Sequence, residues 1–172
     1  MAEAGQSRLL IEALSSRHDR LLFSCGIEAL DRYLRRQASQ DTRKHVAVTF
    51  VLVEAGSPFV SGFYTLSATS LRLSDLPEST VKKLPRYPLV PAILLGRLAV
   101  SQNQRGKGYG ELLLIDALKR CMGTQDIGWA VILVEAKDEQ AAAFYRHYHF
   151  IPFASGSLRL FLPRPTIASL IG

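Results

Sequence analysis

The chain has 172 residues, of which 48% are hydrophobic and 21% charged, and its formal net charge at pH 7 is +6. This length suggests one domain, large enough to bury a core without disulfides or a structural metal. The composition excludes a disordered, collagen-like or coiled-coil chain. No apolar run approaches the roughly 18 residues that indicate a membrane-spanning helix.

The first half of the chain alternates strand and helix patterns. Apolar residues recur at helical spacing between Ile27 and Ala38, and residues 45–54 are dense in β-branched side chains, as strands are. The predicted elements are a strand over residues 8–13, a helix over 26–39, two hairpin strands over 45–54 and 59–67, and a short helix over 74–84.

The second half predicts two buried strands, each followed by a helix. The first of these helices would bury Leu112, Ile115 and Leu118 on one face, and Asp138 is a candidate N-cap for the second. These elements are a strand over 92–100, a helix over 108–122, a strand over 129–135, a helix over 139–148, and short strands over 149–153 and 157–162. The whole order, β-α-β-β-α-β-α-β-α-β-β, predicts a mixed α/β fold in a single domain over residues 1–172.

Only two cysteines are present, Cys25 and Cys121. They do not make a disulfide framework, and neither has a partner at zinc-site spacing. The N-terminal residues lack the pattern of a secretory signal. We therefore expect reduced thiols, no metal and a cytoplasmic location.

The positive charge is clustered. Residues 72–107 hold seven cations and two carboxylates, and a second basic run lies between Arg32 and Lys44. A clustered excess attracts a polyanion such as a nucleic acid or a phosphate-bearing cofactor. An ordinary solvated basic face is the alternative.

A glycine-rich segment connects the predicted strand 92–100 to the helix that follows. Gly106, Gly108 and Gly110 alternate there, flanked by Arg105 and Lys107. Successive amides at a helix N-terminus form an anion site, so the segment predicts a cradle for phosphate or pyrophosphate. It lacks the Ser or Thr of a P-loop and the spacing of a dinucleotide-binding loop. A purely structural turn is the alternative.

The motif Arg105-x-x-Gly108-x-Gly110 resembles the Arg/Gln-x-x-Gly-x-Gly/Ala signature of GNAT-type N-acetyltransferases. The resemblance implies a mixed central sheet flanked by helices, with acetyl-CoA as co-substrate. It also implies that the strand main chain pairs with the pantetheine arm and that the loop amides bind the pyrophosphate. The cofactor-binding residues it implies are Leu98, Ala99, Val100, Arg105, Gly106, Lys107, Gly108, Tyr109, Gly110 and Asp138.

The segment from Val134 to Phe150 also resembles the family, and the resemblance places Tyr145 in the general-acid position. A core aromatic is the alternative, because Tyr145 has aromatic neighbours in the sequence. Two residues depart from the family pattern: Asp138 stands where Asn is frequent, and His149 where Gly is usual. We expect the first change to matter little, since both residues cap helices, and the second to alter the turn into the next strand.

Four further motifs resemble the acetyltransferase toxins of bacterial type II toxin–antitoxin modules. The resemblance implies a toxin that acetylates the α-amino group of aminoacyl-tRNA and blocks translation. It further implies a ribbon-helix-helix antitoxin, operator DNA bound only through the antitoxin complex, and a homodimer as one state to test. The motifs are Phe23-Ser-Cys-Gly26-x-x-x-Leu30-Asp31-x-Tyr33-Leu34, Gly62-Phe-Tyr64-Thr-Leu-Ser67, Leu84-Pro-Arg-Tyr-Pro88 and Leu95-Gly-Arg-Leu-Ala-Val100.

The cations are candidate tRNA contacts, although for each one taken alone the sequence favours an ordinary surface charge. The candidates are Arg72, Lys82, Lys83, Arg86 and Arg97, with Arg35, Arg36, Arg43 and Lys44 as a second patch.

The segment 79–110 contains no Asp or Glu that could act as a general base. An α-amine, with a pKa near 7.7–8, needs such a base less than a lysine side chain with a pKa near 10.4 does. The sequence therefore favours an α-amine acceptor. A small-molecule or protein N-terminal acetyltransferase and a non-enzymatic binding module of the same fold are the alternatives.

Overall fold

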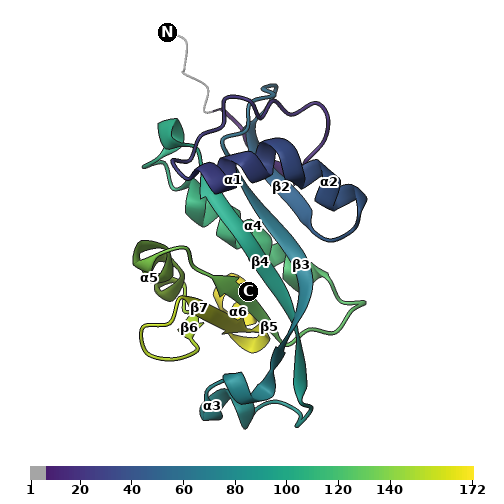
Figure 1. Ribbon diagram of the computed structural model, residues 1–172, viewed down its shortest axis with the longest axis vertical. Helices are drawn as coiled ribbons and strands as arrows, with labels where there is room; N and C mark the ends of the chain where they lie inside the picture. Colours follow the sequence, from purple (N-terminus) through teal and green to yellow (C-terminus); the bar gives the residue numbers. More distant parts are fainter. Residues whose placement is uncertain (1–6) are drawn as a thin grey trace. The chain divides into compact units, whose positions relative to one another are not determined.

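Seven strands and six α-helices, joined by three short turns of other helical types, make up residues 7–172, which the computed structural model describes (Figure 1). The strands are β1 (Leu9–Ala13), β2 (Val48–Glu54), β3 (Gly62–Arg72), β4 (Leu89–Val100), β5 (Val131–Glu135), β6 (Ile151–Pro152) and β7 (Arg159–Pro163). The α-helices are α1 (Glu28–Arg32), α2 (Ala38–Arg43), α3 (Glu78–Val81), α4 (Tyr109–Gly123), α5 (Glu139–His147) and α6 (Arg164–Ile171). The short turns are η1 (Tyr33–Gln37), η2 (Leu73–Asp75) and η3 (Gln102–Gln104).

The strands form one mixed sheet in the order β1-β2-β3-β4-β5-β7-β6. Strands β4 and β5 run parallel, from Ala92 opposite Val131 to Leu95 opposite Val134. The pairs β1–β2, β2–β3, β5–β7 and β6–β7 are antiparallel. This mixed sheet with its helices confirms the predicted fold class, while the predicted domain bounds of 1–172 stay a prediction.

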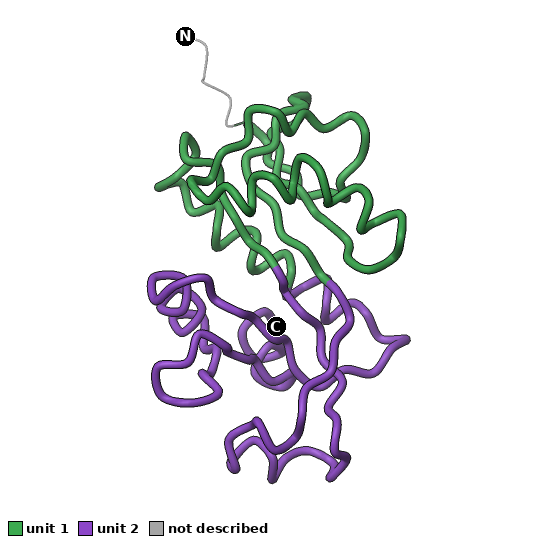
Figure 2. The backbone as a smooth tube through the Cα atoms, in the orientation of Figure 1, with its two compact units in different colours: residues 1–66, 97–117 green, residues 67–96, 118–172 purple. Residues whose placement is uncertain are grey.

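The chain divides into two compact units (Figure 2). Unit 1 comprises the chain up to Leu66 together with Arg97–Ala117, and unit 2 comprises Ser67–Gly96 and Leu118–Gly172. Strands β3 and β4 each contribute residues to both units.

The core of unit 1 lies between the first helices and the sheet. The Phe63 ring stacks on Tyr33 and meets the edge of Phe23, with ring centroids 6.5 and 5.5 Å apart. Neighbouring strand residues face opposite sides of a sheet, so Gly62 faces the other side. There a Cβ on Gly62 would lie 2.9 Å from Leu113 Cδ1 of α4. Glycine at this position therefore permits the close packing of α4 on β3.

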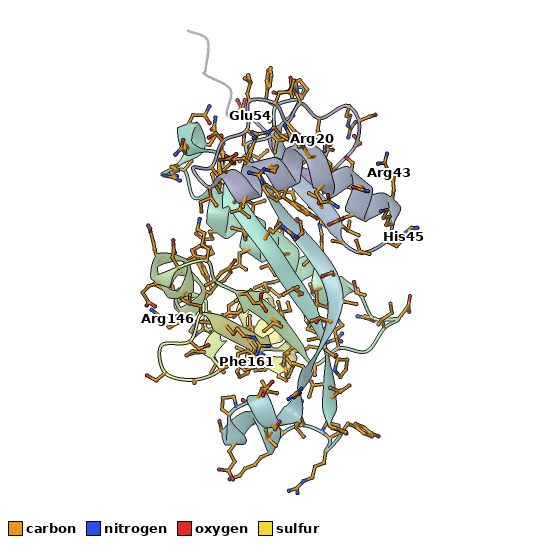
Figure 3. The ribbon with its side chains drawn as sticks, viewed as in Figure 1. Arg20, Arg43, His45, Glu54, Arg146 and Phe161 are labelled. Atoms are coloured by element: carbon orange, nitrogen blue, oxygen red, sulfur yellow. The ribbon has the colours of Figure 1, made fainter. Side chains whose placement is uncertain are left out.

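In unit 2, buried residues of β4, β5 and β7 form a second apolar cluster. Phe161 of β7, labelled in Figure 3, is fully buried in it beside Val131 and Ala92. Leu71 and Leu76 join this cluster from the chain around η2. The segment between β3 and β4 is thereby anchored to the sheet.

The predicted buried face of α4 is only partly right. Leu112 is 43% exposed and Ile115 is only partly buried, so Leu118 alone of the predicted face is buried. Three successive leucines, 112–114, offer two adjacent faces, and the sheet packs against the one with Leu113 and Leu114. The final helix α6 was not predicted.

The predicted helix 26–39 is longer than expected and is not uniformly α-helical. Its middle turn, η1, is a π-helical segment, and the helical run continues through α2 to Arg43. The predicted helix 74–84 is shorter than expected and consists of η2 and the single turn α3. Among residues 7–172, no helix is long and apolar enough to span a membrane.

Candidate active site

The glycine-rich loop follows the end of β4 and is held at its start by two backbone bonds. The Ser101 amide donates to the Ser61 carbonyl, and the Gln102 amide to the Ser24 carbonyl, each at 2.8 Å. The turn η3 comes next, and α4 begins at Tyr109. These bonds place the loop at the end of β4, as the sequence predicts.

The loop presents free amides at the start of α4. Gly106 and Gly108 both have left-handed backbones, with φ of +79° and +78°, which glycine adopts without strain. The N–H groups of residues 106–111 donate to no acceptor within the described chain, residues 7–172. The first amides of any helix lack intrahelical partners and carry its positive partial charge. The loop is therefore a ready site for a phosphate-bearing ligand.

Arg105 ties this loop to the turn that precedes α1. Its guanidinium donates to the Cys25 carbonyl at 2.7 Å. The adjacent Gly26 has φ +89°, and a Cβ there would lie 2.6 Å from Gln102 Nε2. The sequence indicates Arg105 as added charge and as part of the family signature, and it gives no signal for this anchoring role.

Lys107 of the same loop is an exposed cation. Its Nζ donates to Gln104 Oε1 at 2.8 Å and lies 5.9 Å from the Tyr109 ring centroid. Tyr109 itself is buried at the start of α4. Lys107 therefore adds positive charge at the edge of the free amides.

Tyr145, in unit 2, is buried on α5. Its ring centroid lies 5.3 Å from those of both Phe144 and Phe150. Burial raises the pKa of the Tyr145 hydroxyl above its usual value of 10. The hydroxyl therefore keeps its proton throughout the neutral range and can serve as a proton donor.

Asp138 caps the start of α5, as the sequence predicts. Its Oδ1 accepts the Ala141 amide at 2.8 Å, which satisfies one of the unpaired donors of the first turn. The carboxylate is therefore engaged within its own helix.

The end of α5 is a Schellman motif. The His149 amide donates to the Arg146 carbonyl at 3.0 Å, and the Phe150 amide to the Tyr145 carbonyl at 3.2 Å. His149 occupies the left-handed position with φ +70°. The expectation that His149 would alter this turn is wrong, because His149 takes the conformation that glycine favours.

Arg97 of β4 lies against the π-helical turn η1. Its guanidinium carbon is 3.5 Å from the ring centroid of Tyr33, whose hydroxyl donates to Asp41 Oδ2 at 2.8 Å. Burial, followed by the bond to Asp41, raises the pKa of Tyr33 to about 12. Arg97 is half-buried and has no acceptor within residues 7–172. The sequence indicates Arg97 as a cation and gives no signal that Tyr33 is its partner.

The other predicted tRNA contacts lie mostly on the surface. Arg35 is the exception: it is half-buried, and its guanidinium donates to the Phe23 carbonyl at 3.2 Å. Lys82, Lys83 and Arg86 lie in the segment between β3 and β4, and Arg72 is the last residue of β3. The exposed cations are Arg36, Arg43 and Lys44 in unit 1 and Arg72, Lys82, Lys83 and Arg86 in unit 2.

Cys25 and Cys121 are both buried cysteines. Burial raises the pKa of the Cys121 thiol to about 12. Within residues 7–172, no group of three or more His, Cys, Asp or Glu side chains is placed to hold a metal ion.

The fold and the loop define the class of protein. A model of the acetyltransferase (GNAT) domain matches residues 48–152, and the chain belongs to this family. This confirms the family resemblance seen in the sequence.

Two similar proteins carry the names of toxins. The chain is 36% identical, over its whole length and that of the relative, to the probable toxin TacT of Sinorhizobium fredii (strain NBRC 101917 / NGR234). It is 38% identical to the tRNA-acetylating toxin of Mycobacterium tuberculosis (strain ATCC 25618 / H37Rv), over 92% of this chain and 94% of that one.

Solved structures of similar proteins share the fold over nearly the whole chain. A tyrosine-to-phenylalanine mutant of KacT superposes with a TM-score of 0.90 and 31% identity, covering 96% of this chain and 99% of that one. AtaT complexed with acetyl-methionyl-tRNAfMet superposes with a TM-score of 0.87 and 30% identity, covering 96% of this chain and 100% of that one. The third structure is a tyrosine-to-phenylalanine mutant of AtaT bound to the C-terminus of the antitoxin AtaR and to acetyl-CoA. It superposes with a TM-score of 0.77 and 27% identity, covering 95% of this chain and 97% of that one.

Proposed function

We propose that this protein is the toxin of a bacterial toxin–antitoxin module. It transfers an acetyl group from acetyl-CoA to the α-amino group of aminoacyl-tRNA and thereby blocks translation. The observation that carries the enzymatic part is the run of free amides over residues 106–111, at the start of α4 and directly after β4. The choice of tRNA is supported by the similarity to tRNA-acetylating toxins.

Acetyl-CoA binds through main-chain groups in this proposal. The pyrophosphate takes the amides of residues 106–111, with Arg105 and Lys107 adding charge. The pantetheine arm pairs with the main chain of Leu98, Ala99 and Val100 at the end of β4. Asp138 stays a predicted cofactor contact, and its bond to the Ala141 amide supports a role in fixing the start of α5.

The transfer step moves one acyl group and two protons. The neutral amine attacks the thioester carbonyl, and the negative charge that develops on its oxygen is stabilised by the Val100 amide. The new C–N bond forms and the C–S bond breaks. The departing thiolate takes the proton of the Tyr145 hydroxyl, while the amine loses a proton to water. The thiol of coenzyme A and the acetylated amine are the products.

The protonation states suit an α-amine. The raised pKa of Tyr145 keeps that hydroxyl protonated when the amine is neutral. An α-amine, with a pKa near 7.7–8, is substantially neutral at physiological pH. The absence of Asp and Glu from residues 79–110 is therefore compatible with this substrate.

The tRNA contacts and the cellular partners are further parts of the proposal. Phosphate contacts come from the exposed or half-buried cations, which would make binding salt-dependent. A ribbon-helix-helix antitoxin neutralises the enzyme, and operator DNA is bound only through that complex. We place the protein in the cytoplasm with its substrate. A homodimer is the oligomeric state to test. The cations are Arg35, Arg36, Arg72, Lys82, Lys83, Arg86 and Arg97.

The test is transfer of radiolabel from acetyl-CoA to a total pool of aminoacylated tRNA, with deacylated tRNA as the control. Label on the aminoacylated pool alone supports the proposal. Label on both pools would move the acceptor from the α-amine to the RNA itself. No label on either, with acetyl-CoA still bound, would overturn the tRNA substrate and favour a small amine or a protein N-terminus.

A further inference from the structure

Tyr87, in the segment between β3 and β4, is the most exposed aromatic side chain of residues 7–172. It is 70% exposed, compared with 50% for Phe59. Burying an aromatic ring is strongly favourable, and other apolar residues of the same segment, Leu73, Val81 and Leu84, pack against a buried apolar cluster. The exposure of Tyr87 is therefore a feature to be explained.

The segment around Tyr87 is well anchored. Leu73, Val81 and Leu84 pack against the buried cluster of unit 2. The Leu73 amide donates to the Pro88 carbonyl at 3.0 Å, which fixes the chain directly after Tyr87. Pro88 also restricts the backbone of Tyr87 itself. The ring therefore stands on a fixed support, and holding it against a ligand requires little further ordering.

Unpaired cations surround Tyr87 in the sequence. Lys82, Lys83 and Arg86 lie within five residues of it, and all three are exposed. Within residues 7–172 none of the three has a carboxylate partner. The segment has two carboxylates, Asp75 and Glu78, and more cations than that, so its net charge is positive.

An open groove begins next to Tyr87. It has a volume of about 620 Å³, and Pro88, Leu89 and Leu73 give it apolar walls. Arg72 lines the same groove, as does Glu78. Single-stranded nucleic acids bind where an exposed aromatic ring stands beside a groove and free cations, with bases stacked on the ring and phosphates on Lys or Arg.

We propose that Tyr87 stacks on an unpaired nucleobase of the tRNA, while Lys82, Lys83 and Arg86 contact the adjoining phosphates. This rests on the proposed function and identifies a base-binding residue for its substrate. An acidic protein surface would also pair with the cations, but it would not account for the exposed ring of Tyr87. The unpaired base belongs either to the 3′ end of the tRNA or to one of its loops, and the two sources are separable by truncation.

The test measures tRNA binding separately from acetyl transfer. We expect Tyr87→Ala to weaken binding of aminoacyl-tRNA about tenfold, as loss of one stacked base does. The salt dependence of binding should stay that of the wild type. Tyr87→Trp should restore binding, because a larger ring stacks at least as well. Lys82→Gln with Lys83→Gln should instead lower the salt slope by about one to two.

Phe59→Ala is the matched control, since Phe59 is the other highly exposed aromatic and lies in unit 1. It should leave tRNA binding unchanged. If tRNA truncated at its 3′ ACCA end binds wild type and Tyr87→Ala equally, the base comes from that end. If the difference persists, the base comes from a loop.

Several outcomes would overturn the inference: equal binding by Tyr87→Ala and wild type, equal weakening by Tyr87→Trp, or a loss of acetyl-CoA affinity that matches the loss of tRNA affinity. A wild type that binds tRNA through Tyr87 but transfers no acetyl group would overturn the proposed function and keep the inference. A wild type that binds no tRNA would overturn both.

Discussion

Phe150 fixes Tyr145 in two ways at the end of α5. The Phe150 amide donates to the Tyr145 carbonyl at 3.2 Å, and the two ring centroids are 5.3 Å apart. A Schellman motif pairs this backbone bond with an apolar contact between the same two positions. The position of the proposed acid therefore depends on how the helix ends, and His149 is the residue at which the chain turns.

We predict that His149→Gly stabilises the protein. A left-handed backbone costs a residue with a Cβ about 1–2 kcal/mol, whereas glycine loses about 0.5–1 kcal/mol more chain entropy on folding. The net gain in the free energy of unfolding should be about 0.5–1 kcal/mol, or a rise in Tm of about 1–4 °C. Thermal unfolding of both proteins in the same buffer measures it.

The chain contains a matched control for this substitution. His45 follows α2 in a second Schellman motif, with φ +58° and bonds from the amides of His45 and Val46 to the carbonyls of Thr42 and Asp41 (Figure 3 labels His45). His45→Gly should give a similar gain in Tm, but only His149→Gly changes a residue near Tyr145. A fall in Tm for both variants would show that the histidine side chains make stabilising contacts that outweigh the strain.

Tyr145→Phe should remove activity without unfolding the protein. Only the hydroxyl is lost, and the ring still packs against Phe144 and Phe150. Loss of a general acid lowers kcat by about 10²–10⁴-fold, while acetyl-CoA affinity and Tm should stay near the wild-type values. Single-turnover kinetics with saturating acetyl-CoA, together with calorimetric binding, separate these quantities.

The pH profile of the wild type provides a second test of Tyr145. The amine must be neutral, so kcat/KM should rise with pH through the pKa of the amine. The acid must be protonated, and burial raises its pKa above 10, so no alkaline fall should occur below about pH 10. A fall centred near pH 8 would identify some other group as the acid.

The parts of the fold that the sequence predicts are those with strong local patterns. The β-branched run of β2, the glycine-rich loop before α4 and the Asp138 cap of α5 all form where their patterns place them. Each depends on residues close together in the chain. For the same reason the amino-acid sequence alone is enough to predict the loop as a phosphate site, and that role stays a prediction.

The parts that could not be predicted depend on tertiary contacts. Three leucines in a row do not say which pair faces the sheet, and the sheet selects Leu113 and Leu114. The helix α6 has Pro165 in its first turn, which is favourable there but in the sequence resembles a helix breaker. Arg97 and Tyr33 are 64 positions apart, so their contact has no local signal.

We predict that Gly26→Ala weakens acetyl-CoA binding as well as folding. A Cβ there would be strained at φ +89° and would lie 2.6 Å from Gln102 Nε2 and 3.5 Å from Arg105 Nη2, the group that anchors the loop. Backbone strain alone costs about 1–3 kcal/mol.

Gly56→Ala is the control, since Gly56 has φ +81° with no atom within 4 Å of a new Cβ. Both variants should lose stability, and only Gly26→Ala should lose affinity for acetyl-CoA. Equal affinities for the two variants would separate the Gly26 turn from the loop.

Arg97 should matter for the tRNA and little for stability. The Arg97 guanidinium lies over the Tyr33 ring. The carboxylate of Asp41 accepts a hydrogen bond from the Tyr33 hydroxyl and makes none with Arg97. Removing a cation–π contact costs about 0.5–1 kcal/mol at an exposed site and about 2 kcal/mol at a desolvated one, and the half-buried Arg97 lies between these. Removing a phosphate contact weakens tRNA binding and lowers the salt slope by about one. Arg97→Met should therefore raise the KM for aminoacyl-tRNA several-fold while leaving the KM for acetyl-CoA unchanged.

The control for Arg97 is Arg32→Met, because Arg32 is an exposed cation already paired with Glu28 at 3.0 Å. It should change neither KM by more than about twofold, since exposed ion pairs contribute about 0–1 kcal/mol. Tyr33→Phe keeps the ring beneath Arg97 and removes the bond to Asp41, so it should lower stability and leave tRNA binding intact. If Tyr33→Phe weakened tRNA binding as much as Arg97→Met, the Asp41 bond would be needed to orient Arg97. If Arg97→Met lowered Tm but not tRNA affinity, Arg97 would serve the packing of η1 against β4.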